Sequence, residues 1–317
     1  MNHDAKTVFA AAIGEHRPII LDGGLATQLE AQGCDISNAL WSASLLATDS
    51  QAIVNASRAY LDAGAECIAT ASYQASRDGF ATLGLAADEA DALMLLSVEL
   101  AERARDAYLL DNPDCTYVPM IAASIGPYGA ALHDGSEYTG SYRVAADALR
   151  AFHIDRLKLF DSSDADVLAL ETIPSITEAR VLAELLRDCA TPAWVSFSCC
   201  DEKHICDGTR IEEAASVFSG HPTVLAVGVN CTSPQYLPPL IRAIRSTLPD
   251  IAILAYPNSG ETYNVTNNTW SGTVSPLDCA TAALAWVAAG ATLVGGCCRM
   301  GPEHISAITK RLKETNL

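Results

Sequence analysis

Three cysteines at the ends of two apolar segments have the clearest chemical potential in this sequence. Cys231 ends the segment VLAVGVNC, and Cys297 and Cys298 end the segment ATLVGGCC. If the two loops meet, three thiolates could bind one zinc ion and leave its fourth position open, as in a catalytic zinc site. The residues alone leave two other interpretations open, buried thiols and redox-active thiols.

A second group of thiols competes with the first. Cys199, Cys200 and Cys206 lie with His204 in the polar stretch CCDEKHICDGTR. This stretch is either a second candidate metal site or an exposed loop that is rich in cysteine. The chain has 11 cysteines. In a reducing compartment this number favours metal binding or reactive thiols over a framework of disulfides.

Two carboxylates end apolar segments in the same way. Asp22 follows PIIL and precedes two glycines, and Glu171 ends VLALE. Burying a carboxylate without a partner is costly. We therefore expect each to face a cation, and the ammonium group of a substrate would serve. A structural salt bridge or a helix cap is the alternative for both.

Aromatic and amide side chains form a third set. Trp41, Tyr73, Tyr128 and Tyr138 lie in or near predicted loops. Aromatic faces attract onium cations, although loop aromatics can also serve in packing. Gln74 and Asn258 lie at the C-terminal ends of predicted strands, as several of these aromatics and the thiols do.

The elements that must position these residues follow from eight β-type segments. Several are continuously apolar, which is typical of parallel strands that are covered on both faces. They span residues 18–24, 66–73, 117–126, 166–172, 193–199, 223–231, 251–260 and 291–298.

Helical patterns separate these segments. Ser175 and Glu178 form a predicted capping box, and Ser233 with Pro234 marks another helix start. Residues 93–110 read as a long helix. The pattern predicts a (β/α)8 TIM-type barrel, with an open doubly wound sheet as the alternative. No linker marks a boundary, so we expect a single domain over residues 1–317.

The barrel prediction explains where the candidate residues lie. Active sites of such barrels form at the C-terminal ends of the strands. Each candidate lies at or just after such an end: Asp22, Tyr73, Gln74, Tyr128, Glu171, Cys231, Asn258, Cys297 and Cys298.

Composition excludes several classes of partner. The net charge of -18 and a pI near 4.6 would repel nucleic-acid phosphates. The first residues lack the pattern of a signal peptide. Residues 279–298 carry no charge, but Gly290 divides them into a helix and a strand, so we expect no membrane span and a cytoplasmic protein.

With these motifs assembled, the chain resembles the homocysteine S-methyltransferase family. The similarity runs from LDGGLATQLE at 21–30, through NC at 230–231, to GGCCR at 295–299. The branch that uses S-methylmethionine or S-adenosylmethionine is the most similar. It matches at LWSASLL, IATASYQAS, SIGPYGAALHDGSEY, ALETIP and YPNSGE.

The resemblance implies roles for the candidate residues. Cys231, Cys297 and Cys298 would bind one Zn²⁺, and Glu171 would hold the homocysteine ammonium group. Asp22 would lie beside the thiol or the ammonium group. Trp41, Tyr73, Gln74, Tyr128 and Asn258 would contact the donor.

The implied reaction is methyl transfer from a sulfonium donor to the homocysteine thiol, which forms methionine. A betaine-, methylfolate- or selenocysteine-linked methyltransferase on the same fold is one alternative. A thiol redox or metal-sensing protein is the alternative from another class.

Overall fold

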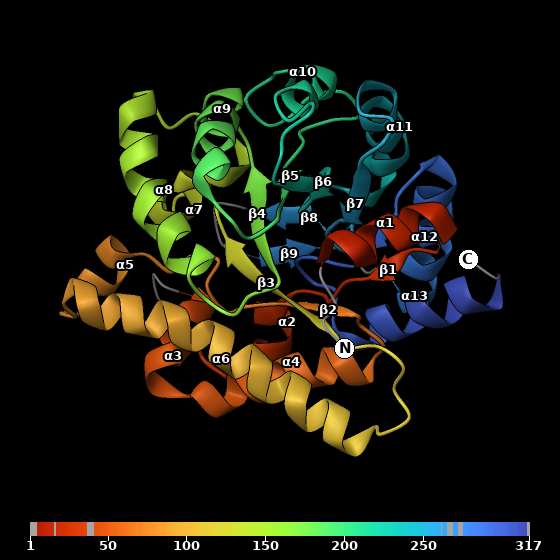
Figure 1. Ribbon diagram of the computed structural model, residues 1–317, viewed down its shortest axis with the longest axis horizontal. Helices are drawn as coiled ribbons and strands as arrows, with labels where there is room; N and C mark the ends of the chain where they lie inside the picture. The colour runs from red at the N-terminus through yellow and green to blue at the C-terminus, as the bar shows by residue number, and fades with distance from the viewer. Residues whose placement is uncertain are drawn as a thin grey trace.

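The computed structural model describes residues 5–15, 17–36, 41–260, 262–264, 269–271 and 275–315. Eight parallel strands form one sheet in the order β1-β10-β7-β6-β5-β4-β3-β2, with helices around them (Figure 1). The strands are β1 (Ile19–Ile20), β2 (Cys67–Ala69), β3 (Met120–Ile125), β4 (Val167–Ile173), β5 (Ala193–Phe197), β6 (Val224–Asn230), β7 (Ala252–Tyr256) and β10 (Leu293–Val294). A separate antiparallel pair, β8 (Thr262–Asn264) and β9 (Thr269–Ser271), follows β7.

Hydrogen bonds between the first and last strands of this order close the sheet into a barrel. The amide of Asp22 donates to the carbonyl of Cys67 at 3.0 Å, and the amide of Glu66 donates to the carbonyl of Ile20 at 2.7 Å. All eight β-type segments of the sequence contain one of these strands. The predicted (β/α)8 barrel is therefore confirmed, and the open doubly wound sheet is not the fold.

Helices surround the strands, most of them over the outer face of the barrel (Figure 1). The longer ones are α1 (Ala5–Glu15), α4 (Ser50–Asp62), α6 (Ala87–Asp111), α8 (Ala146–Asp161), α9 (Ile176–Leu185), α11 (Leu237–Thr247), α12 (Pro276–Ala289) and α13 (Pro302–Glu314). Shorter ones are α2 (Leu25–Ala31), α3 (Leu45–Thr48), α5 (Arg77–Ala81), α7 (Tyr128–Leu132) and α10 (Ile211–Ser216). The described residues also form 3-10 turns, η1 (Trp41–Ser44), η2 (Ser136–Tyr138), η3 (Leu186–Asp188) and η4 (Pro234–Tyr236).

Alternation along the strands divides the core into two parts. One set of strand residues packs outward beneath the helices, for example Ile68, Leu168 and Val227. The other set points into the barrel, for example Val167, Ala169 and the neighbouring inward residues of other strands. In β4 this inward phase continues to Glu171, so the strand itself carries a carboxylate into the barrel.

Helix α1 closes the N-terminal end of the barrel. Phe9 is 2% exposed and belongs to the same cluster as the inward residues at the strand starts. Its ring stacks on Trp194 at the start of β5, with 6.4 Å between ring centroids. The opposite, C-terminal end is left for the functional site.

The predicted capping box of α9 forms only in part. The Ser175 side chain accepts a hydrogen bond from the Glu178 amide at 3.2 Å, so the helix begins where the sequence predicts. The carboxylate of Glu178 does not return to Ser175. It accepts instead from the Tyr128 amide at 2.6 Å and contacts His153 Nε2 at 2.7 Å.

The apolar stretch at 279–298 divides as the sequence predicts. Helix α12 ends before Gly290, which adopts a left-handed conformation with φ of 116°, and β10 follows. Within the described part of the chain, no helix is both long and apolar enough to cross a bilayer.

Candidate active site

A large cavity opens at the C-terminal ends of the strands. Its volume is about 960 Å³, within the range for small-molecule sites. Most of the residues predicted from the sequence line it: Asp22, Tyr73, Gln74, Glu171, Cys231, Cys297 and Cys298. The barrel thus brings together side chains that lie far apart in the sequence.

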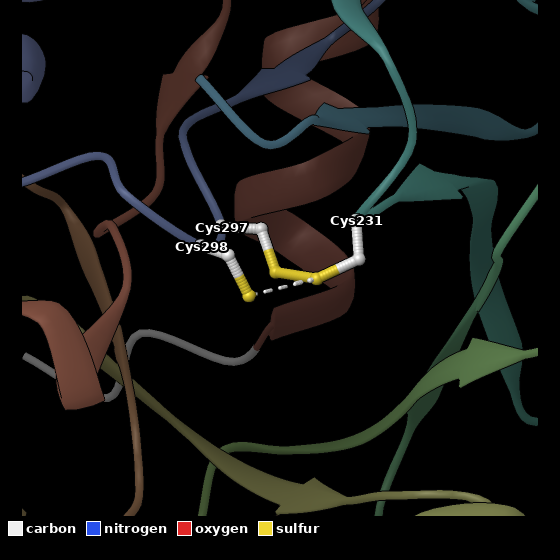
Figure 2. Close-up of side chains that lie close together, drawn as sticks. All are labelled: Cys231, Cys297 and Cys298. Atoms are coloured by element: carbon white, nitrogen blue, oxygen red, sulfur yellow. Dashed lines mark hydrogen bonds between the residues drawn. A yellow bond between two sulfur atoms is a disulfide. The ribbon is translucent and has the colours of Figure 1, made fainter. Parts of the chain in front are cut away.

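The three cysteines meet in this cavity. Their sulfur atoms all lie within 4.8 Å of one another, and Sγ of Cys231 and Cys298 are 3.7 Å apart. Figure 2 shows the three side chains converging, with Cys231 and Cys297 joined in a disulfide. Sulfurs bound to one tetrahedral zinc ion lie about 3.8 Å apart, because each Zn–S bond is about 2.3 Å. Once reduced, this cluster therefore fits a zinc ion with three protein ligands.

Local backbone geometry sets the thiols in place. Cys231 has a φ of 43°, a left-handed conformation that side chains other than glycine adopt rarely. A Cβ on Gly295 would lie 2.6 Å from Leu21 Cβ and 2.7 Å from the Asp22 carbonyl oxygen. The glycine therefore allows the end of β10 to approach β1, which places the following cysteines over the barrel.

Asp22, which is buried, and Glu171, which is half-buried, form a pair of carboxylates in the cavity that holds the thiols. Burial raises the pKa of Asp22 to about 8, the Ala69 amide opposes this shift by donating to Oδ2 at 2.7 Å, and the charge of Glu171 adds to it. Burial also raises the pKa of Glu171, against the hydrogen bonds from Ser124 and Tyr256. Two carboxylates that disfavour each other's charge make a site that a bound cation would relieve.

A bulge in β4 directs Glu171. The register between β4 and β5 shifts between Leu170 and Ile173, and Thr172 has a φ of 62°. This conformation is strained for a β-branched residue. Oε1 of Glu171 accepts from the Ser124 hydroxyl, and Oε2 accepts from the Tyr256 hydroxyl at 3.1 Å.

Asn230, which the sequence analysis treated only as part of the motif before Cys231, stabilises this bulge. It is 1% exposed, and its Oδ1 accepts from the Thr172 amide at 2.8 Å and from the Ser196 hydroxyl at 2.9 Å. Its Nδ2 donates to Thr172 Oγ1 at 2.8 Å and lies 4.0 Å from Cys297 Sγ. Since Ser196 also contacts the Tyr256 hydroxyl, one network joins the carboxylate pair to the thiols.

Tyr73 and Tyr138 form the aromatic part of the cavity wall. The Tyr138 hydroxyl hydrogen-bonds to the Cys298 thiol, and Tyr73 hydrogen-bonds to Thr172. Burial raises the pKa of Cys298 to about 11, and the Tyr138 hydrogen bond opposes this shift. A buried thiol of this kind keeps its proton near neutral pH unless a metal ion replaces it.

Glu137 is a cavity residue that the sequence analysis did not select. It precedes Tyr138 in η2, and burial raises its pKa to about 7. Its Oε2 is inaccessible to water and has no hydrogen-bond partner in the described residues. The sequence offered one signal for it, since Glu137 directly precedes the candidate aromatic Tyr138 in the polar stretch GSEY.

Two of the predicted contact residues lie outside the cavity lining, and the side chain of a third is not described. Tyr128 begins α7 and packs edge-on against Tyr142 and Phe152, and it is not among the cavity-lining residues. Asn258 also lies outside the lining, and its side chain accepts from the Gly260 amide at 3.0 Å. Trp41 begins η1, and its side chain falls outside the described part of the structure.

The competing cysteine loop does not assemble in the same way. Cys199 is buried while Cys200 is exposed. Within the described residues, only Cys231, Cys297 and Cys298 come close enough together to hold a metal ion among the His, Cys, Asp and Glu side chains.

Comparison with known proteins agrees with this geometry. The family model for homocysteine S-methyltransferase matches residues 19–312. The chain belongs to the homocysteine S-methyltransferase family. Homocysteine S-methyltransferase YbgG of Bacillus subtilis is 45% identical over 92% of this chain and 93% of its own length. The family resemblance seen in the sequence is thereby confirmed.

Solved structures of a family member cover nearly the same range. The homocysteine methyltransferase MmuM from Escherichia coli superposes in its oxidised form with a TM-score of 0.84 and in its metallated form with 0.83. Each is 39% identical and covers 93% of this chain and 96% of that one. A metallated form of that family member accords with the fit of the three cysteines to a metal.

Proposed function

We propose that this protein transfers a methyl group from a sulfonium donor to the thiol of L-homocysteine, forming methionine. S-methylmethionine or S-adenosylmethionine is the proposed donor. The observation that carries the proposal is the meeting of three thiols with the carboxylates of Asp22 and Glu171 in one cavity. Family membership of the chain agrees with this reaction.

The proposed role of Cys231, Cys297 and Cys298 is to hold one Zn²⁺ ion through their sulfurs. When bound, the ion supplies an open position at which the homocysteine sulfur is deprotonated at neutral pH and so becomes nucleophilic. The three cysteines must be reduced to bind it, so the disulfide between Cys231 and Cys297 has to open first. A reducing compartment such as the cytoplasm would keep them in that state.

Asp22 and Glu171 are proposed to hold the homocysteine ammonium group. Burial and mutual repulsion disfavour a negative charge on both carboxylates at once. A cation bound between them would favour the ionised form of both. Ser124 and Tyr256 fix the Glu171 carboxylate, so the amino acid would bind in one orientation. A fixed ammonium group also fixes the direction of the homocysteine side chain toward the thiols.

The remaining part of the cavity suits a cationic donor. Its acidic lining residues are Glu30, Asp35, Asp134 and Glu137, and the tyrosines Tyr73 and Tyr138 lie beside Cys298. Acidic groups and aromatic faces both attract a sulfonium. Alignment of the two sulfurs on opposite sides of one methyl carbon would supply much of the rate enhancement.

A donor screen tests the proposal. S-methylmethionine, S-adenosylmethionine and betaine are each supplied with homocysteine to the reduced, zinc-loaded protein, and methionine is measured with and without a chelator. We expect methionine from a sulfonium donor, none from betaine, and loss of activity with the chelator. The variant Cys298→Ala should lose both zinc and activity. A variant that retained full zinc and normal turnover would contradict the three-thiol site.

A further inference from the structure

We infer that Glu137 binds the α-ammonium group of the sulfonium methyl donor, at a second cation site in the cavity. The inference rests on the proposed function, because it concerns the second substrate of that reaction. It assigns a role to a carboxylate that the first substrate leaves unused.

The substrates themselves require two such sites. Homocysteine and either sulfonium donor each carry an ammonium group, and both must lie in one cavity during the transfer. One carboxylate pair cannot hold two ammonium groups whose sulfurs face each other across a methyl carbon. A second anionic group is therefore needed on the far side of the reacting sulfurs.

The carboxylates of the cavity fall into two separate groups. Asp22 is affected by the charge of Glu171, whereas the charge that acts on Glu137 is that of Asp134. Tyr73 lines the same cavity, and burial raises its pKa with help from the charges of both Glu137 and Glu171. The cavity therefore has one acidic group at the ends of β1 and β4 and another in η2.

Glu137 also lies near Cys298, one of the proposed zinc ligands. Its neighbour Tyr138 hydrogen-bonds to Cys298, and the charge of Glu137 acts on that thiol. A donor with its ammonium group on Glu137 would thus lie along the tyrosines, with its sulfonium close to the zinc ligands. The ammonium groups of homocysteine and of the donor would then bind at different carboxylates, and the two substrate sulfurs would meet near the cysteines.

The turn that carries Glu137 is firmly held. The Ser198 hydroxyl donates to the Glu137 carbonyl at 2.9 Å, and a Cβ on Gly129 would lie 2.6 Å from the Glu137 amide nitrogen. The turn therefore packs directly on α7. By contrast, the carboxylate Oε2 is buried without a partner in the described part of the chain. An acid with a buried, unpaired oxygen, on a well-packed turn in a substrate cavity, is typical of a ligand site.

The variant Glu137→Gln tests the inference. With S-methylmethionine we expect kcat/KM to fall about 10- to 100-fold, the effect of losing one hydrogen bond to a charged group. With 4-(dimethylsulfonio)butanoate, which has the same sulfonium and carboxylate but no amino group, the wild type and the variant should be equal. The KM for homocysteine and the zinc content should not change.

Glu99→Gln serves as the matched control. It makes the same chemical change on the outer helix α6, where Glu99 is exposed and lies outside the cavity lining. It should leave the KM of S-methylmethionine within about two-fold, the expectation for a screened surface charge. Equal use of S-methylmethionine by wild type and Glu137→Gln, with intact zinc and homocysteine KM, would overturn the inference but leave the proposed function standing. A wild type that makes no methionine from any sulfonium would instead overturn the proposed function.

Discussion

Glu171 shows how one residue can combine structural and substrate-binding roles. It lies in a strand that is otherwise apolar, and both of its oxygens accept hydrogen bonds from neutral hydroxyls. Neutral donors orient a carboxylate without neutralising it. The charge of Glu171 therefore remains available for a substrate cation, and Asp22 reinforces it.

Replacing Glu171 with glutamine should separate substrate binding from metal binding. The side chain keeps its size while the charge is lost, so we expect the KM for homocysteine to rise about 10- to 100-fold. Zinc content should remain at the wild-type level, since Glu171 is not among the thiol ligands. Steady-state kinetics and elemental analysis measure the two quantities.

The control for this variant is Glu213→Gln, at an exposed position on α10 outside the cavity lining. It removes the same charge and should change the KM for homocysteine little. An unchanged KM in Glu171→Gln would exclude this residue as the ammonium partner.

At the scale of the strand, the alternation of side chains between the two faces explains how the polar floor of the site is built. The inward phase that begins with apolar residues ends in Ser124, Glu171, Ser196, Asn230 and Tyr256 on five successive strands. Of these only Glu171 was chosen from the sequence, because a charge in an apolar strand is conspicuous. The neutral ones could have been found by extending the inward phase to each strand end.

Other parts of the site could not be read from strand patterns. The bulge at Thr172 depends on the hydrogen bonds that Thr172 exchanges with Asn230, which is 58 residues further along the chain. The orientation of Glu178 away from its helix cap depends on His153 and on the Tyr128 amide. Such long-range hydrogen bonds override the local signals that sequence analysis uses.

The variant Asn230→Ala tests whether this network supports the site. It would leave the buried Thr172 amide without a partner, at a cost of about 1–3 kcal/mol in the free energy of unfolding. The bulge that orients Glu171 would also loosen, so the KM for homocysteine should rise together with the loss of stability. Denaturant unfolding and kinetics report the two effects.

Asn55→Ala is the corresponding control on the outer surface. Asn55 lies exposed on α4 and accepts from Gln51 Nε2 at 3.0 Å. The same chemical change there should alter neither stability nor KM appreciably. If Asn230→Ala matched this control, the network would have no part in holding the site.

At the scale of the whole molecule, the sequence predicts the barrel well because its signals repeat. Each of the eight apolar segments contains a strand, and Gly290 ends α12 as a C-terminal glycine should. The role of α1 was not predicted, since its sequence shows helix propensity but not which surface it covers. Only the closed barrel creates the apolar opening over which Phe9 packs.

The variant Phe9→Ala tests whether this end of the barrel serves stability alone. Truncating a buried phenylalanine costs about 3–5 kcal/mol, so the melting temperature should fall by roughly 10 °C. The active site lies at the opposite, C-terminal end of the barrel. The values of kcat and of both KM, measured well below the unfolding temperature, should therefore match the wild type. The exposed Thr7→Ala on the same helix should change neither quantity. A loss of activity in folded Phe9→Ala protein would show that the closed end also influences the geometry of the thiols, through the strands that connect the two ends.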